Sequence, residues 1–178
     1  MKITLLYILY VSLSYSQNYS LNLSGDGQYI EVANASAVIT NSAQMTISGW
    51  IHPRNTDVGW PDLDAFFGIR NETNADFYIL QLGGYKLEGR LRTDSGVFTI
   101  VTDPNAISPD TWHHVALVYD GSTIMLYIDG IPTNSAEANG QIPDPSVSFY
   151  IGSLVYSVWV FDLDGLIDEI RIWNIFSV

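Results

Sequence analysis

Acidic residues near the C-terminus have the spacing most suggestive of chemistry. Because successive residues of a strand point to opposite faces, an extended segment from Gly165 to Trp173 would place Asp168 on one face with Leu166, Ile170 and Ile172. A carboxylate among core residues is costly unless a cation accompanies it, and no lysine or arginine is close by on that face. A calcium ion, which takes about six to eight oxygen ligands, would resolve the conflict. The alternative is that Asp168 lies at the frayed start of the strand and caps a turn.

A second acidic group lies in segments that read as loops. Asp162 and Asp164 flank Leu163, and three more aspartates surround the Trp60-Pro61 segment: Asp57, Asp62 and Asp64. These carboxylates predict either a second cation site or the solvated loop residues that Asp most often provides.

Aromatic residues in turn-like segments are the candidates for ligand binding. Tyr156, Trp159 and Phe161 lie in the segment from 153 to 164, and Trp60 and Tyr85 are the next choice. Sugars present flat apolar faces that stack on aromatic rings, and neighbouring polar groups hold their hydroxyls. The alternative is a hydrophobic flap folded over the edge of the domain.

No catalytic residue is assigned. His113 and His114 are adjacent in a predicted strand, so they point to opposite faces and cannot bind one ion together. None of the five glutamates has the paired-carboxylate context of retaining glycosidases, whose two carboxyls lie about 5 to 5.5 Å apart. A nucleophile elbow, a phosphate loop and a dinucleotide fingerprint are also missing from the sequence.

The elements that position these residues belong to one domain. The chain has 178 residues, of which 47% are apolar and 15% charged, so it can build a single core. A net charge of −12 repels phosphate backbones and anionic headgroups, which makes nucleic acid and bare membrane poor partners. The chain contains no cysteine, so no disulfide supports the fold.

The N-terminus predicts secretion. Lys2 precedes a mostly apolar stretch from Ile3 to Val11, and Ser14 and Ser16 are small residues in the positions that a signal peptidase reads. We therefore assign residues 1–16 to a signal peptide, because the stretch is too short to span a bilayer, which needs about 20 apolar residues. The alternative is an ordinary first strand.

The rest of the chain predicts an all-β protein. Short apolar alternations recur between turns rich in Gly, Asp, Asn and Pro. The clearest hairpin joins Trp112–Tyr119 to Thr123–Ile128 through Asp120-Gly121, and a second Asp-Gly turn follows at Asp129-Gly130. Trp112 is predicted to be a core residue. Further strands are predicted over residues 21–23, 29–32, 45–51, 66–70, 77–82, 86–93, 97–101, 146–151 and 165–173, whereas 153–164 is predicted to be a loop.

Six ordered segments together resemble a LamG-like domain of the concanavalin A-like lectin/glucanase superfamily. They are Leu21–Val32, Met45–Pro53, Trp112–Gly121, Leu126–Gly130, Tyr150–Gly152 and Gly165–Trp173. The resemblance implies a jelly-roll β-sandwich of two antiparallel sheets over residues 17–178. It also implies a structural calcium ion between the first hairpin and the last strand, at Asp26, Gly27 and Asp168.

Members of this family serve as sugar-binding, adhesive or enzyme-associated modules, so the resemblance alone does not identify a ligand. We expect a secreted, non-catalytic module, supported by calcium, that binds an extracellular glycan or polysaccharide outside the cell or at its surface. The alternatives are a module that adheres to a surface protein and a domain related to glycoside hydrolases.

Overall fold

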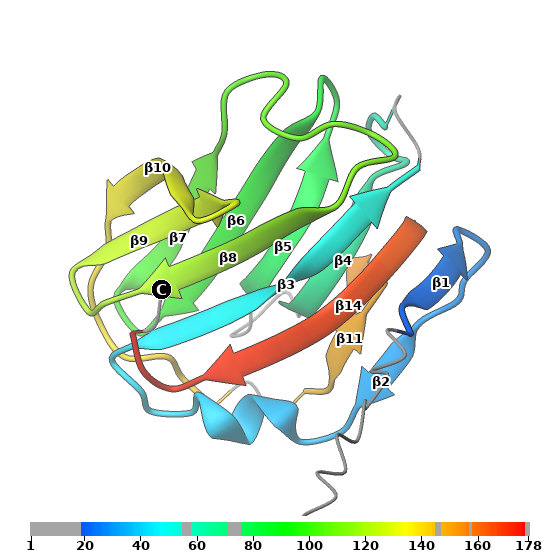
Figure 1. Ribbon diagram of the computed structural model, residues 1–178. Coiled ribbons are helices and arrows are strands. Elements are labelled where there is room, and N and C mark those ends of the chain that lie inside the picture. Colours follow the sequence, from blue (N-terminus) through cyan, green and yellow to red (C-terminus); the bar gives the residue numbers. More distant parts are fainter. Residues whose placement is uncertain (1–18, 55–57, 71–75, 145–146, 157, 177–178) are drawn as a thin grey trace, which may run out of the picture.

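The chain folds into two stacked antiparallel sheets (Figure 1). The computed structural model describes residues 19–54, 58–70, 76–144, 147–156 and 158–176. The segment assigned to the signal peptide, residues 1–16, lies outside the described residues. Within the described part, no helix is long and apolar enough to cross a membrane.

The first sheet, called sheet A here, contains the last strand and the hairpins named above. Its strand order is β1 (Leu21–Ser24), β14 (Asp164–Trp173), β3 (Met45–Pro53), β8 (His113–Tyr119), β9 (Thr123–Ile128) and β10 (Ile131–Glu137). The two Asp-Gly hairpins are confirmed, and both Asp129 and Gly130 have positive φ angles, as a tight hairpin turn requires. Strand β10 was not predicted.

The second sheet, called sheet B, is built mainly from the meander in the middle of the chain. Its order is β2 (Ile30–Val32), β11 (Phe149–Ile151), β4 (Asp64–Arg70), β5 (Asp76–Leu82), β6 (Lys86–Thr93) and β7 (Gly96–Val101). A 3-10 helix, η1 (Ala35–Val38), follows β2. The jelly-roll sandwich predicted from the sequence is confirmed.

Strict alternation along β3 separates the core from the outer surface of sheet A. Met45, Ile47 and Ile51 are fully buried between the sheets. Trp50, one residue from Ile51, must therefore point outward, and its side chain is partly exposed. Gly49 faces inward, where a Cβ would require the side chain of Ile170 to shift.

A bulge in β14 overturns the predicted face of Asp168. The pairing of β14 with β3 shifts register between Asp168 and Arg171, and Glu169 between them has a φ angle of 51°. Ile167 is buried in the core, so its neighbour Asp168 points outward. Beyond the bulge Ile170 and Ile172 pack on the core. The predicted alternation from 166 to 172 was wrong, because the extra residue at the bulge places Leu166 and Asp168 on the opposite face from Ile170 and Ile172.

The segment predicted to be a loop, 153–164, is mostly a hairpin. Strands β12 (Ser153–Tyr156) and β13 (Trp159–Asp162) pair with each other and cover the outer face of β4 and β5. Leu154 and Phe161 face each other across this hairpin and are buried in a second apolar cluster with Ala65, Tyr78 and Leu80. This arrangement matches the hydrophobic flap that the sequence left as an alternative.

Candidate functional site

The outer face of sheet A has a hollow of about 520 Å³ with two tryptophans in its wall. Trp50 comes from β3, and Trp112 immediately precedes β8. Their exposed fractions are 38% and 37%, respectively. The rest of the lining is provided by Ser20 and, from β14, Leu166, Asp168 and Glu169. Two rings and two carboxylates therefore meet in one open cleft.

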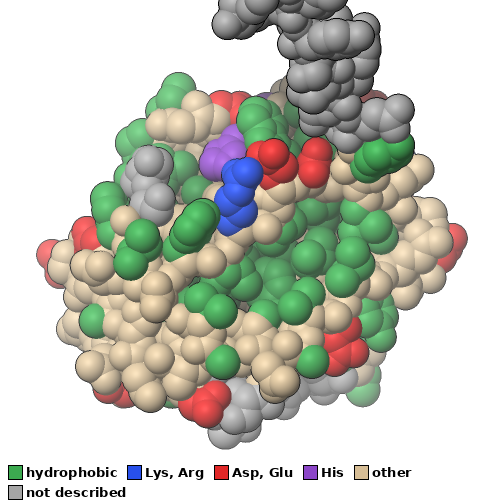
Figure 2. Space-filling view, turned by 60° about the horizontal axis from the view of Figure 1, so that its bottom comes forward, with side chains coloured by type: hydrophobic (Ala, Val, Ile, Leu, Met, Phe, Trp, Pro, Cys, Tyr) green, Lys and Arg blue, Asp and Glu red, His purple; other side chains and the backbone are tan. Residues whose placement is uncertain are grey.

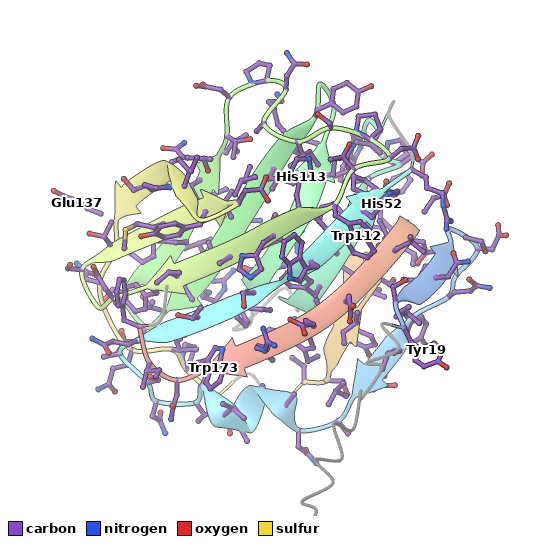
Figure 3. The ribbon with its side chains drawn as sticks, viewed as in Figure 1. Tyr19, His52, Trp112, His113, Glu137 and Trp173 are labelled. Atoms are coloured by element: carbon purple, nitrogen blue, oxygen red, sulfur yellow. The ribbon has the colours of Figure 1, made fainter. Side chains whose placement is uncertain are left out.

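Histidine rings hold both tryptophans in position. Trp50 lies 5.4 Å from His114 and Trp112 lies 5.2 Å from His52, between ring centroids, and both pairs meet edge to face. Figure 3 shows Trp112 and His52 together over the end of β3, away from the core. The prediction that Trp112 is a core residue was wrong, because this residue precedes the strand and its ring packs on the outer surface against His52.

The polar groups of the hollow are linked through the bulge in β14. Asp168 Oδ1 accepts a hydrogen bond of 2.7 Å from the backbone N–H of Glu169. The Glu169 carboxylate pairs with the Arg171 guanidinium at 2.9 Å, and both side chains are about half exposed. An ionised carboxylate can accept about four hydrogen bonds, so Asp168 retains acceptor capacity toward a ligand in the hollow.

A second hollow of about 230 Å³ continues along the same face. Ser48 and Thr46 line it from β3, and Arg171 and Trp173 line it from β14. Its other lining residues are His114, Ala116, Tyr127 and Gly130. In Figure 3, Trp173 lies at the far end of β14 from Trp112. Partly exposed aromatic rings thus stand at both ends of this face of sheet A.

A third, apolar hollow opens beside this surface. On the side shown in Figure 2, apolar side chains gather in a hollow with acidic and basic side chains along its rim. It is lined by Tyr19, Leu21, Ile30, Ile151, Ile167, Asp168, Glu169 and Ile170. Asp168 and Glu169 therefore stand between an aromatic hollow and an aliphatic one.

Comparison with known families identifies the fold. A family model described as the concanavalin A-like lectin/glucanases superfamily, of the laminin G type, matches residues 24–176. The chain belongs to this superfamily. A search among curated proteins gave no significant match.

Solved structures of this concanavalin A-like fold include sugar-binding modules. The sialidase CBM40 of Ruminococcus gnavus bound to α2,3-sialyllactose is 15% identical, with a TM-score of 0.70 over 90% of this chain and 92% of that one. Domain 4 of the extracellular arabinanase AbnA from Geobacillus stearothermophilus, in complex with arabinotriose, is 20% identical, with a TM-score of 0.62 over 89% and 72%. Domains LG4-5 of the mouse laminin α1 chain are 15% identical, with a TM-score of 0.66 over 89% and 42%. At these identities the likeness concerns the fold.

The aromatic residues predicted to bind the ligand do not form one site in this concanavalin A-like domain. Trp60 and Trp159 lie together, with ring centroids 5.4 Å apart, and Trp60 is 61% exposed. Phe161 lies beneath Trp60, but it is only 1% exposed, so a sugar cannot stack on it. Its assignment to the ligand site was therefore wrong, because the hairpin buries its ring against sheet B. The side chain of Tyr156 lies outside the described part of the chain.

Tyr85 is separate from these rings. It has a positive φ angle of 57° in the turn between β5 and β6, and its partly buried side chain packs on the main core. It therefore supports the turn rather than the Trp60–Trp159 surface.

The three residues predicted to hold calcium are not brought together. Ser24 pairs with Asp164, so the turn with Asp26 and Gly27 lies at the start of β14. Asp168 is four residues farther along that strand, or about 13 Å at about 3.3 Å per residue. Among the described residues, no group of three or more His, Cys, Asp or Glu side chains is arranged to hold a metal ion. The predicted set does not fit a calcium site in this structure.

Hydrogen bonds hold this turn instead. Asp162 accepts from the backbone N–H of Gly27 at 3.0 Å and from the Ser153 hydroxyl at 2.9 Å. The Arg54 guanidinium donates to the backbone oxygen of Leu23 and to the side chains of Asn22 and Asp164. Asp162 and Asp164, which were considered for a second cation site, thus form hydrogen bonds that hold the turn.

Calcium binding itself stays a prediction, and thermal melting with a chelator tests it. A bound ion at a hundred times its dissociation constant adds about 2.7 kcal/mol to stability, so its removal should lower the melting midpoint by several degrees. If excess chelator leaves the midpoint unchanged, Arg54 and Asp162 are sufficient to clamp the turn.

The adjacent histidines have separate environments, as their strand positions predicted. His113 Nδ1 is 2.8 Å from Asp129 Oδ2, whereas the His114 ring faces Trp50 on the outer surface. The Asp129 carboxylate also accepts from the backbone N–H of His114, so it joins the start of β8 to the turn between β9 and β10.

Sequence reasoning missed the outer face of sheet A, although β3 carried a usable signal. Thr46, Ser48, Trp50 and His52 alternate with Met45, Ile47, Gly49 and Ile51 along the strand, so that polar and aromatic residues share one phase. A tryptophan on the polar phase of such a strand must be exposed or covered by another element. The sequence contains no comparable signal for the bulge at Glu169. Without knowledge of the bulge, Asp168 could not be placed beside Trp50.

Proposed function

We propose that this chain is a non-catalytic carbohydrate-binding module that holds its ligand on the outer face of sheet A. The observation that carries the proposal is the hollow in which Trp50 and Trp112 stand beside Asp168. Half-exposed rings can stack on the apolar face of a sugar, and a carboxylate can accept hydrogen bonds from its hydroxyls. The sugar ligands bound by two similar structures support the same class of ligand.

Binding without catalysis fits the polar groups of the hollow. Glycosidases place two carboxyls on either side of the scissile bond. Here the two carboxylates are adjacent in the chain, and Glu169 is held in an ion pair by Arg171. A place outside the cell is supported by the signal-like N-terminus and by likeness to domains of an extracellular arabinanase and of a laminin.

Adhesion to a protein is the second candidate, and a different surface favours it. The hairpin β12–β13 presents Val155, Val158 and Val160 to solvent beside Trp60 and Trp159. Clustered apolar side chains of this kind often mark protein contacts.

Substitution of the two groups of tryptophans separates these functions. In glycan-array and affinity-electrophoresis measurements, Trp50→Ala and Trp112→Ala should each weaken binding about tenfold or more, or about 1.4 kcal/mol. Because both rings are partly exposed, the melting midpoint should change little. Affinity of the unmodified module should lie between about micromolar and millimolar, with repeated sites providing avidity.

Trp159→Ala is the matched control, since its ring is similarly exposed on the β12–β13 hairpin, which packs on sheet B and not on sheet A. It should retain full glycan binding. If Trp159→Ala loses the glycan while Trp50→Ala and Trp112→Ala keep it, the ligand site lies on the hairpin and the present assignment is wrong.

A further inference from the structure

We infer that the two hollows of sheet A are successive subsites for one uncharged glycan chain, and that the charges between them exclude acidic glycans. The inference rests on the proposed function and adds to it the class of ligand. It depends on two features of the surface: the two hollows are continuous, and their charged side chains are mainly negative.

The two hollows are joined along β3 and through the contact between Trp50 and His114. Trp50 lines the first hollow, while Ser48 and Thr46, two and four residues away on the same face, line the second. The His114 ring, which belongs to the second hollow, touches Trp50 at 5.4 Å. The two hollows therefore share a wall, and a ligand that stacks on Trp50 can reach both.

The charges on this surface are mainly negative. Asp168 and Glu169 line the first hollow, and Arg171 lines the second. Arg171 is already paired with Glu169 at 2.9 Å, so Asp168 is the charge left over. A sugar carboxylate or sulfate would meet this excess negative charge on a protein whose net charge is −12.

The other described cations belong to different parts of the molecule. Arg54 is used by the turn after β1, and Lys86 lies on sheet B. Arg70 and Arg92 pair with Asp76 on sheet B, and Arg90 donates to the hydroxyl of Tyr78 there. Within the described residues, Arg171 is thus the single arginine or lysine side chain that lines the two hollows.

An uncharged glycan matches these groups. Its hydroxyls can donate to Asp168, while its ring faces pack on Trp50 and Trp112. Ser48 and Thr46 form the floor of the second hollow but are mostly buried, and the Thr46 hydroxyl donates to the backbone oxygen of Ile175. This expectation differs from the acidic sialyllactose bound to the similar CBM40 structure, because a shared fold does not fix the ligand.

The test compares neutral and acidic polymers by affinity electrophoresis of the full chain. The neutral probes are β-1,3-glucan, β-1,4-xylan, β-1,4-mannan, β-1,4-galactan and α-1,5-arabinan, and the acidic probes are alginate, polygalacturonate and hyaluronate. At low salt, at least one neutral probe should retard the protein and no acidic probe should. Retardation should persist in 0.5 M NaCl, since stacking and neutral hydrogen bonds are weakly screened.

A charge variant sharpens the test. Glu169→Gln keeps the size of the side chain and releases Arg171, so it should raise retention by acidic probes about threefold or more. Arg171→Gln is the matched control and should leave the acidic probes unbound. Circular dichroism spectra and melting midpoints of both variants should match those of the unmodified protein.

Three outcomes would overturn the inference, and they separate it from the proposed function. Preferential retention by an acidic probe, lost in Trp50→Ala, would leave the glycan site in place but contradict its selectivity. Retention by a neutral probe that survives Trp50→Ala and Trp112→Ala would refute the site itself. Absence of retention by every probe would contradict both.

Discussion

Phe161→Ala should lower the free energy of unfolding by about 3 to 5 kcal/mol, the usual cost of truncating a large aromatic ring in a packed interior. Phe161 was predicted from sequence to face a ligand, yet its ring is enclosed by the second apolar cluster beneath the β12–β13 hairpin. The truncation would leave a cavity between Leu154 and the outer face of β4 and β5. Urea denaturation gives the change in unfolding free energy directly.

Trp159→Ala provides the comparison within the same strand. Its ring is half exposed and touches Trp60, so its loss should cost much less stability than that of Phe161. Glycan binding by the folded fraction of Phe161→Ala should be unchanged. A stable Phe161→Ala protein that no longer bound glycan would show that the ring faces the ligand after all.

Asp64→Asn should stabilise the protein at neutral and alkaline pH. Asp64 opens β4 and is only 3% exposed. Its Oδ2 atom has no hydrogen-bond partner, and its Oδ1 atom accepts a long contact of 3.5 Å from the backbone N–H of Asp164. Burial, aided by the negative charges of Asp164 and Asp62, raises the pKa of this carboxyl from 3.8 to about 7.

The raised pKa fixes the sign and the pH range of the effect. Because the folded state holds this proton more tightly, the contribution of Asp64 to stability is fully present below about pH 4. It is lost as the pH rises to about 7, where the carboxyl must ionise in a buried place. The rise in the pKa of Asp64 from 3.8 to about 7 corresponds to at most about 4 kcal/mol of stability.

The measurement is a series of urea denaturations of both proteins between pH 4 and pH 8. The difference in unfolding free energy, variant minus unmodified protein, should grow with pH and level off above about pH 7. Asp62→Asn, a change at an exposed aspartate two residues before β4, should change it much less. Destabilisation of Asp64→Asn at pH 8 would mean that the ionised carboxylate has a favourable partner, as a bound cation would provide.

The sequence was sufficient to predict the sandwich because its signals are local and repeated. The alternation in β3 and the Asp-Gly turns after Tyr119 and Ile128 each specify a strand or hairpin without reference to distant residues. Their order along the chain then specifies the family. An error at one of these positions would leave the other signals, and therefore the predicted fold, unchanged.

The candidate site was harder to predict because it depends on single residues. One bulge at Glu169 turns Asp168 from the core side to the outer surface. The partner of the Ser24–Gly27 turn is decided by the register of β1 against β14, which composition does not reveal. Rings in the segment from 153 to 164 were assigned to a loop because their burial depends on the distant strands β4 and β5.

The bulge at Glu169 also sets a limit on how this gene can vary. Insertions and deletions are usually tolerated in loops and rejected within strands, but here a one-codon deletion would have an unusually specific effect. Loss of Glu169 would restore strict alternation across β14 and leave the other residues on their present faces, with Ile167, Ile170 and Ile172 toward the core and Arg171 and Trp173 outside. A deletion at any other position of β14 would exchange the two faces of the strand on one side of it, so changes of length are confined to the bulge, and homologues that lack the extra residue should keep the same pattern of polar and apolar residues after it.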